Sequence, residues 1–173
     1  MHCRKYGLLF ICAAFVMTFL VARNHQLYAQ SGIGKNVAAS AVPAQDFQLE
    51  DLKGAKVKLS DFRGKRPVLL YFGAKWCPAC QAARPSIIAM RMNTKEEDLA
   101  MLEVYIGTRD TLEEVKRYDA GHPAPFPVLY DKDATVARTY GIMGIPSFIL
   151  VSREGTVVFR DYELPKDISQ YTK

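Results

Sequence analysis

Two short segments alternate apolar and polar residues, which is the pattern of half-buried β-strands. They are FQLEDL (47–52) and KVKLSDF (56–62), and Lys53-Gly54 separates them, so the pattern predicts a β-hairpin. The run PVLLYFGA (67–74) is continuously apolar and of strand length. Such a run predicts a buried central strand.

Strands and helices alternate along the rest of the chain. Further strands are predicted over MLEVYIGT (101–108), at the end of the proline-rich segment 121–131, over SFILVS (147–152) and over TVVFRDY (156–162). Helices are predicted over 81–91, over 110–120 after a capping-box pattern, over 133–141, and in a last segment, LPKDISQYTK (164–173). This order predicts an α/β fold: a central mixed sheet flanked by helices on both faces, with an added N-terminal hairpin.

The first thirty residues differ in composition from the rest. A basic start, MHCRK, precedes the uninterrupted apolar run Tyr6–Ala22, and a polar stretch follows. This pattern predicts either a signal peptide or an N-terminal membrane anchor over residues 1–30, with the remainder exported. The small and polar residues 31–45 predict a linker, which leaves 46–173 as the folded domain.

The net charge of +5 is concentrated at the front of the 173-residue chain. Arg4, Lys5 and Arg23 lie in the first thirty residues, which contain no acid, and the remaining chain carries 20 basic and 18 acidic side chains. No basic stripe or aromatic RNA-binding motif accompanies this small excess. Nucleic acid is therefore not expected as a partner.

Cys77 and Cys80 are the only cysteines beyond residue 12. A structural disulfide across two intervening residues would remove little entropy from the unfolded chain. A structural zinc site needs four ligands, and His122 is the only histidine outside the signal region. No metal and no other cofactor is expected, and thiol–disulfide chemistry is the leading interpretation.

The cysteines fall between a predicted buried strand and a predicted helix. The amino end of a helix has unpaired N–H groups and a partial positive charge, both of which favour a thiolate. Cys77 comes first and is expected toward solvent as the attacking sulfur, with Cys80 deeper as the resolving sulfur. Pro78 suits the first turn of the helix. Lys75 is either a further source of positive potential or a solvated surface lysine.

The motif WCPAC (76–80) with Pro85, together with GIPSF (144–148), resembles the thioredoxin superfamily. Over about residues 46–164 the chain is similar to the TlpA/ResA-like, redoxin or AhpC/TSA-type thiol–disulfide oxidoreductases of the bacterial envelope. The resemblance implies a thioredoxin fold and disulfide exchange with protein substrates, as a reductant rather than an oxidant. It also implies a periplasmic location, or attachment to the inner membrane facing the periplasm, and a membrane partner that donates electrons.

The resemblance also identifies the surroundings of the cysteines. It implies a cis-proline at Pro146 that faces the pair, with the backbone of Ile145 available to a substrate strand. Trp76 and Pro78 would complete the substrate-binding surface.

Two positions depart from related families. Tyr71 stands where thioredoxins carry a buried aspartate, and Ala83 stands where ResA-like reductases often carry a glutamate. These departures weaken the transfer of a role in cytochrome c biogenesis.

Two other functions would require different residues around the cysteine pair. A copper or metal chaperone of this fold is the main alternative, but such relatives have three residues between their cysteines. A peroxidase of the peroxiredoxin type would need proline and threonine where Leu70 and Ala74 stand.

Overall fold

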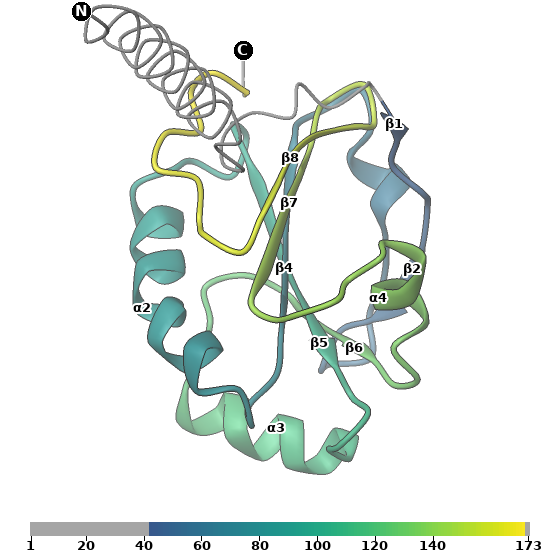
Figure 1. Cartoon of the computed structure of the whole chain (residues 1–173), viewed down its shortest axis with the longest axis vertical. Helices are drawn as coiled ribbons and strands as arrows, with labels where there is room; N and C mark the ends of the chain where they lie inside the picture. The colour runs from purple at the N-terminus through teal and green to yellow at the C-terminus, as the bar shows by residue number, and fades with distance from the viewer. Residues whose placement is uncertain (1–41, 172–173) are drawn as a thin grey trace, which may run out of the picture. The chain divides into compact units, whose positions relative to one another are not determined.

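A six-stranded mixed sheet forms the centre of the domain (Figure 1). The structure is a computed structural model and describes residues 42–171. The strand order is β1-β8-β7-β4-β5-β6, with β4 and β5 parallel, β5 and β6 parallel, and the remaining pairs antiparallel. The strands are β1 (Val42–Pro43), β4 (Val68–Gly73), β5 (Ala100–Ile106), β6 (Val128–Asp131), β7 (Ser147–Val151) and β8 (Thr156–Asp161).

Helices cover both faces of this sheet, as the sequence predicts (Figure 1). They are α2 (Pro78–Met92), α3 (Leu112–Gly121) and α4 (Thr135–Thr139), with the 3-10 helix η1 (Leu59–Phe62). Every residue of β4 is buried, and its side chains alternate between two apolar clusters. Leu69 packs in the cluster that contains Ile87 of α2, whereas Leu70 packs in the cluster that contains Val136 of α4. The buried central strand and the fold class are therefore confirmed.

The predicted hairpin is present as a separate two-stranded sheet. Its strands are β2 (Gln48–Glu50) and β3 (Lys56–Lys58), and they pair in antiparallel register. The Asp51 carboxylate accepts hydrogen bonds from the N–H groups of Lys53 and Ala55, each at 2.8 Å, which closes the turn. The second strand is shorter than the alternating pattern suggests, because the chain enters η1 at Leu59.

The domain includes residues before position 46, where it was predicted to begin. Val42 and Pro43 pair with β8, and Ala44 is buried and donates its N–H to Gly155 O at 2.9 Å. Residues 42–45, the last four of the linker predicted over 31–45, are therefore part of the domain. The rest of that linker and the predicted signal or anchor at 1–30 lie outside the described residues.

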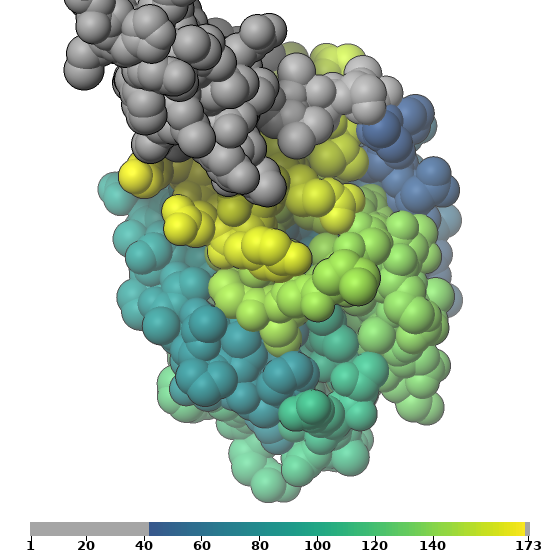
Figure 2. Space-filling view, in the orientation of Figure 1, coloured from purple at the N-terminus to yellow at the C-terminus, as the bar shows by residue number. Residues whose placement is uncertain are grey.

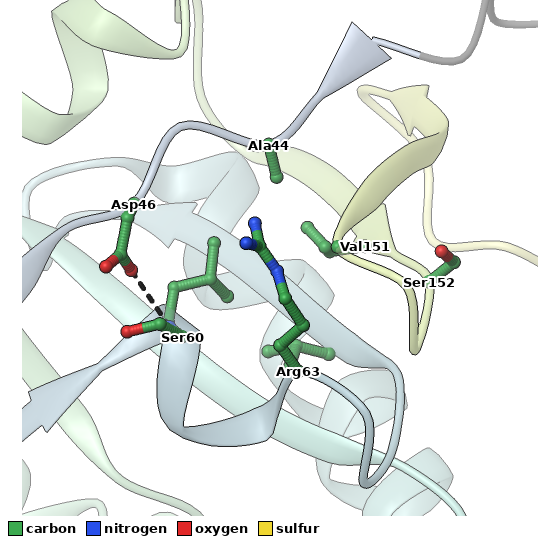
Figure 3. A pocket seen from close by; sticks show the side chains of 9 residues that line it. Ala44, Asp46, Ser60, Arg63, Val151 and Ser152 are labelled. Atoms are coloured by element: carbon green, nitrogen blue, oxygen red, sulfur yellow. Dashed lines mark hydrogen bonds between the residues drawn. The ribbon is translucent and has the colours of Figure 1, made fainter.

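Figure 3 shows how this N-terminal segment is fastened to the domain. The Asp46 carboxylate accepts a hydrogen bond from the Ser60 N–H at 2.9 Å. A small pocket lies between this segment, η1 and the β7–β8 turn, and the Arg63 side chain extends into it between Ala44 and Val151 (Figure 3). This pocket is small and lies at the end of β4 opposite the cysteines, so we assign no ligand to it.

The helix predicted over 164–173 is wrong for the part that the structure describes. Residues 164–171 form irregular backbone with a bend and a turn. The Asp167 carboxylate accepts a hydrogen bond from the Ser169 N–H at 2.8 Å, a local turn that competes with helix formation. Leu164, Ile168 and Tyr171 nevertheless pack on the apolar cluster on the α2 face. Figure 2 shows this yellow segment lying across the surface beside α2. Within residues 42–171, no helix has the length and apolarity needed to cross a bilayer.

Candidate active site

Cys77 and Cys80 lie where β4 gives way to α2. Cys77 is the N-cap residue of the helix, with extended backbone angles, and Pro78 is its first helical residue. Proline is suited to that position because its missing N–H has no partner there in any helix. The two cysteines form a disulfide with a Cα–Cα distance of 5.2 Å. Cys77 Sγ accepts a hydrogen bond from the Cys80 N–H at 3.0 Å. The helix thus directs a backbone donor at the first sulfur.

The loop before β7 lies against this disulfide. The Ile145–Pro146 peptide bond is cis, and Ile145 O is 3.6 Å from Cys77 Sγ. Ile145 also borders all three apolar clusters of the domain, which fixes the loop in place. The structure therefore brings together the two segments, 76–80 and 144–148, that carry the resemblance noted in the sequence.

The two cysteines differ less in solvent exposure than the sequence analysis predicts. Cys77 is 5% exposed and Cys80 2%, so the prediction that Cys77 lies toward solvent is wrong for this disulfide form. The residues around Cys77 are the open ones: Trp76 is 38% exposed, and Pro78 is exposed as well. The side chains on both sides of Cys77 are therefore open to solvent, although Cys77 itself is not.

Lys75 is neither a solvated lysine nor an unpaired positive charge. Its Nζ lies 2.9 Å from an Asp110 carboxylate oxygen and 3.8 Å from one of Glu114. Glu114 also forms the capping box of α3 with Thr111. The two carboxylates offset the positive charge of Lys75, which is one of the two roles considered for it from the sequence.

A buried ion pair lies beneath the cysteine helix, and sequence reasoning missed it. Arg84, one turn after Cys80, places its guanidinium 2.7 Å from the Glu103 carboxylate on β5. Glu103 is 3% exposed and stands in register beside Tyr71 of β4, whose hydroxyl donates to Cys80 O at 3.3 Å. Tyr71 and Ala83 stand where related families carry an acidic residue. Glu103 on the neighbouring strand places a buried carboxylate beside Tyr71. A lone glutamate inside the apolar run MLEVYI was the available signal.

Burial raises the pKa of Glu103 to about 7, although the Arg84 guanidinium lowers it. In the unfolded chain the same carboxyl titrates near 4.5. The folded state therefore binds an extra proton between these values, and stability falls as pH rises from about 4.5 through about 7.

We expect the Glu103→Gln variant to lose this part of the pH dependence. The native protein should lose on the order of 3 kcal/mol of unfolding free energy across the window, relative to the variant. Urea titrations of both proteins at pH 5 and pH 8 measure the difference. Parallel pH profiles for the two proteins would contradict the assignment of Glu103.

His122 does not join the cysteines in the structure. Its Nδ1 lies 3.0 Å from Tyr118 O, and its ring stacks on that of Tyr118 at the end of α3. Across residues 42–171, no cluster of three or more His, Cys, Asp or Glu side chains is arranged to hold a metal ion.

Known proteins resemble this domain in sequence and in fold. Residues 41–160 match the model of the AhpC/TSA family. Over 155 residues the chain is 28% identical to the thiol-disulfide oxidoreductase ResA of Bacillus subtilis, covering 90% of this chain and 85% of that protein.

Solved structures give the same result. One is a Chlorobium tepidum protein assigned as thiol:disulfide interchange protein DsbE, with a TM-score of 0.65 and 30% identity over 73% of this chain and 86% of its own. Another is an exposed lipoprotein thioredoxin of Streptococcus pneumoniae, with a TM-score of 0.63 and 27% identity over 70% of this chain and 92% of its own.

Proposed function

Because this chain belongs to the AhpC/TSA family and is a thioredoxin-fold thiol–disulfide oxidoreductase, we propose that Cys77 is its attacking sulfur and Cys80 its resolving sulfur. The position of Cys77 is the observation that carries this assignment. Its Sγ sits at the mouth of α2, accepts the Cys80 N–H, and lies beside Ile145 O and Pro146. Protein thiols and disulfides are its substrates.

Reduction of a substrate disulfide then follows in two exchanges. The Cys77 thiolate attacks one substrate sulfur, forming a mixed disulfide and releasing the other substrate sulfur as a thiolate, which takes up a proton. Cys80 loses its proton and attacks Cys77 Sγ, which frees the second substrate thiolate and leaves the Cys77–Cys80 disulfide. The helix dipole and the Cys80 N–H stabilise negative charge on Cys77 in the first exchange.

Substrate recognition would use the backbone around the cis-proline. Ile145 O lies within 3.6 Å of the sulfur and can accept a hydrogen bond from an extended substrate segment. Main-chain pairing of this kind is largely independent of the substrate's side chains. Trp76 and Pro78 would line the opposite side of the same surface.

The direction and place of the reaction are further parts of the proposal. We place the domain outside the cytosol, in the periplasm or attached to the inner membrane, because residues 1–30 have the pattern of a signal or anchor. The resemblance to ResA favours a reductant, which would need electrons from a membrane partner.

An insulin assay tests this function directly. The purified chain should speed the reduction of insulin by dithiothreitol, and Cys77→Ser should bring the rate back to the uncatalysed background. The reduction potential of the Cys77–Cys80 couple then indicates direction: a value near −270 mV favours a reductant, and one near −120 mV an oxidant. Stoichiometric retention of copper without insulin reduction would favour the metal chaperone instead.

A further inference from the structure

The loop that follows β5 lies against the loop that carries the cysteines. The Tyr105 hydroxyl connects them: it donates to the Asp110 carboxylate at 2.7 Å and accepts the Lys75 N–H at 2.6 Å. The Lys75–Asp110 ion pair and a hydrogen bond from the Tyr130 hydroxyl to Asp110 O, at 2.7 Å, add two further ties. Residues 107–111 are therefore held at a fixed position beside Trp76.

Arg109 occupies the exposed part of this loop. Its guanidinium carbon lies 4.4 Å from the centre of the Trp76 ring, the geometry of a cation–π contact. Within the part of the chain that the structure describes, the Arg109 side chain makes no ion pair and no hydrogen bond, whereas nearby Lys75 contacts two carboxylates. The cation next to Trp76 that no carboxylate neutralises is thus Arg109, whereas Lys75 is paired.

The Arg109 guanidinium makes its cation–π contact with Trp76 and has no hydrogen-bond partner among the described residues, so its N–H groups remain available. The N–H groups of a guanidinium match the two oxygens of a carboxylate. Trp76 immediately precedes Cys77, so the Arg109–Trp76 pair lies close to the position of a bound substrate's sulfur. An extended chain advances about 3.3 Å per residue, which brings a side chain one or two residues from the substrate cysteine within reach.

The geometry points to Arg109 and Trp76 as a recognition site for an acidic side chain that neighbours the reactive cysteine of the substrate protein. The inference rests on the proposed function, because it needs Cys77 to be the sulfur that substrates meet. It adds a selectivity that main-chain pairing at Ile145 cannot provide. The site would favour substrates with Asp or Glu beside the cysteine over those with a neutral or basic residue there.

Two peptide disulfides that differ in one residue test this site. One carries Glu next to its cysteine and the other Gln, and kcat/KM is measured for each with the reduced full-length chain at low salt. We expect about a three- to fivefold preference for the Glu peptide, the range of an exposed ion pair. The preference should shrink as salt is added. Arg109→Ala should abolish it, and Arg109→Glu should reverse it.

A matched control separates this site from the overall charge of the protein. Arg153 is an exposed arginine in the β7–β8 turn, at the end of the sheet away from the cysteines, and Arg153→Ala should keep the preference. Equal kcat/KM values for the two peptides in the native protein would overturn the inference. So would a preference that survives in Arg109→Ala. If neither peptide nor insulin is reduced at all, it is the proposed function that fails.

Discussion

A chain carrying Cys80→Ser should hold its substrate instead of releasing it. Cys77 can still attack, but no second sulfur is present to resolve the mixed disulfide. Incubation of the reduced variant with an oxidised protein substrate should yield a covalent complex that non-reducing electrophoresis detects. Dithiothreitol should cleave this complex by reducing its disulfide. Multiple turnover should fall to the uncatalysed background.

The reciprocal variant is the control for this experiment. Cys77→Ser should form no complex and show no turnover, because a serine hydroxyl at the helix mouth is a poor nucleophile without an adjacent base. The chain suits such a comparison, since both sulfurs are buried to a similar degree and both substitutions are nearly isosteric. If the complexes appear with Cys77→Ser instead, the attacking and resolving roles are reversed.

Arg84→Met should cost the domain on the order of 3 kcal/mol of unfolding free energy at pH 8. The guanidinium contacts Glu103, approaches Asp119 at 3.4 Å and donates to His122 O at 2.7 Å, so it ties α2 to both β5 and α3. Methionine retains much of the volume but leaves the Glu103 carboxylate buried without its partner. Urea unfolding at pH 8 measures the loss.

The pH dependence shows which part of the loss comes from charge. At pH 5 Glu103 is protonated in the fold, so the cost of Arg84→Met should be smaller there than at pH 8. The double variant Arg84→Met with Glu103→Leu should recover much of the stability, because an apolar pair leaves no charge behind. An Arg84→Met protein as stable as the native one at both pH values would show that the ion pair contributes nothing.

Much of the fold was predictable because it depends on local pattern. The run 67–74 is apolar at every position and of strand length, and a strand buried on both faces accommodates such a run. The hairpin followed from alternation around Lys53-Gly54. The helix over 164–173 failed because a proline suited to a first helical turn does not by itself make a helix. Asp167 closes a local turn instead, and Leu164 and Ile168 pack on the domain from a non-helical segment.

The surroundings of the cysteines were less predictable than the cysteines themselves. The chemistry of WCPAC could be predicted by excluding a structural disulfide and a zinc site and by combining it with GIPSF. The partners of Lys75 and Arg84, in contrast, come from 19 to 39 residues further along the chain. Sequence pattern fixes which strand is buried and says little about which neighbour it receives. Glu103 became visible as part of the site only when the register of β4 and β5 set it beside Tyr71.

The place where the chain enters the domain has a consequence for any tether. Val42 and Pro43 join the sheet near the β7–β8 turn, where β4 begins, while the cysteines follow the other end of β4, about 20 Å away (Figure 1). If residues 1–30 anchor the chain as proposed, the attachment would enter the domain at the end of the sheet opposite the disulfide. The cysteines would then face away from the point of attachment, toward partners that approach from the other side.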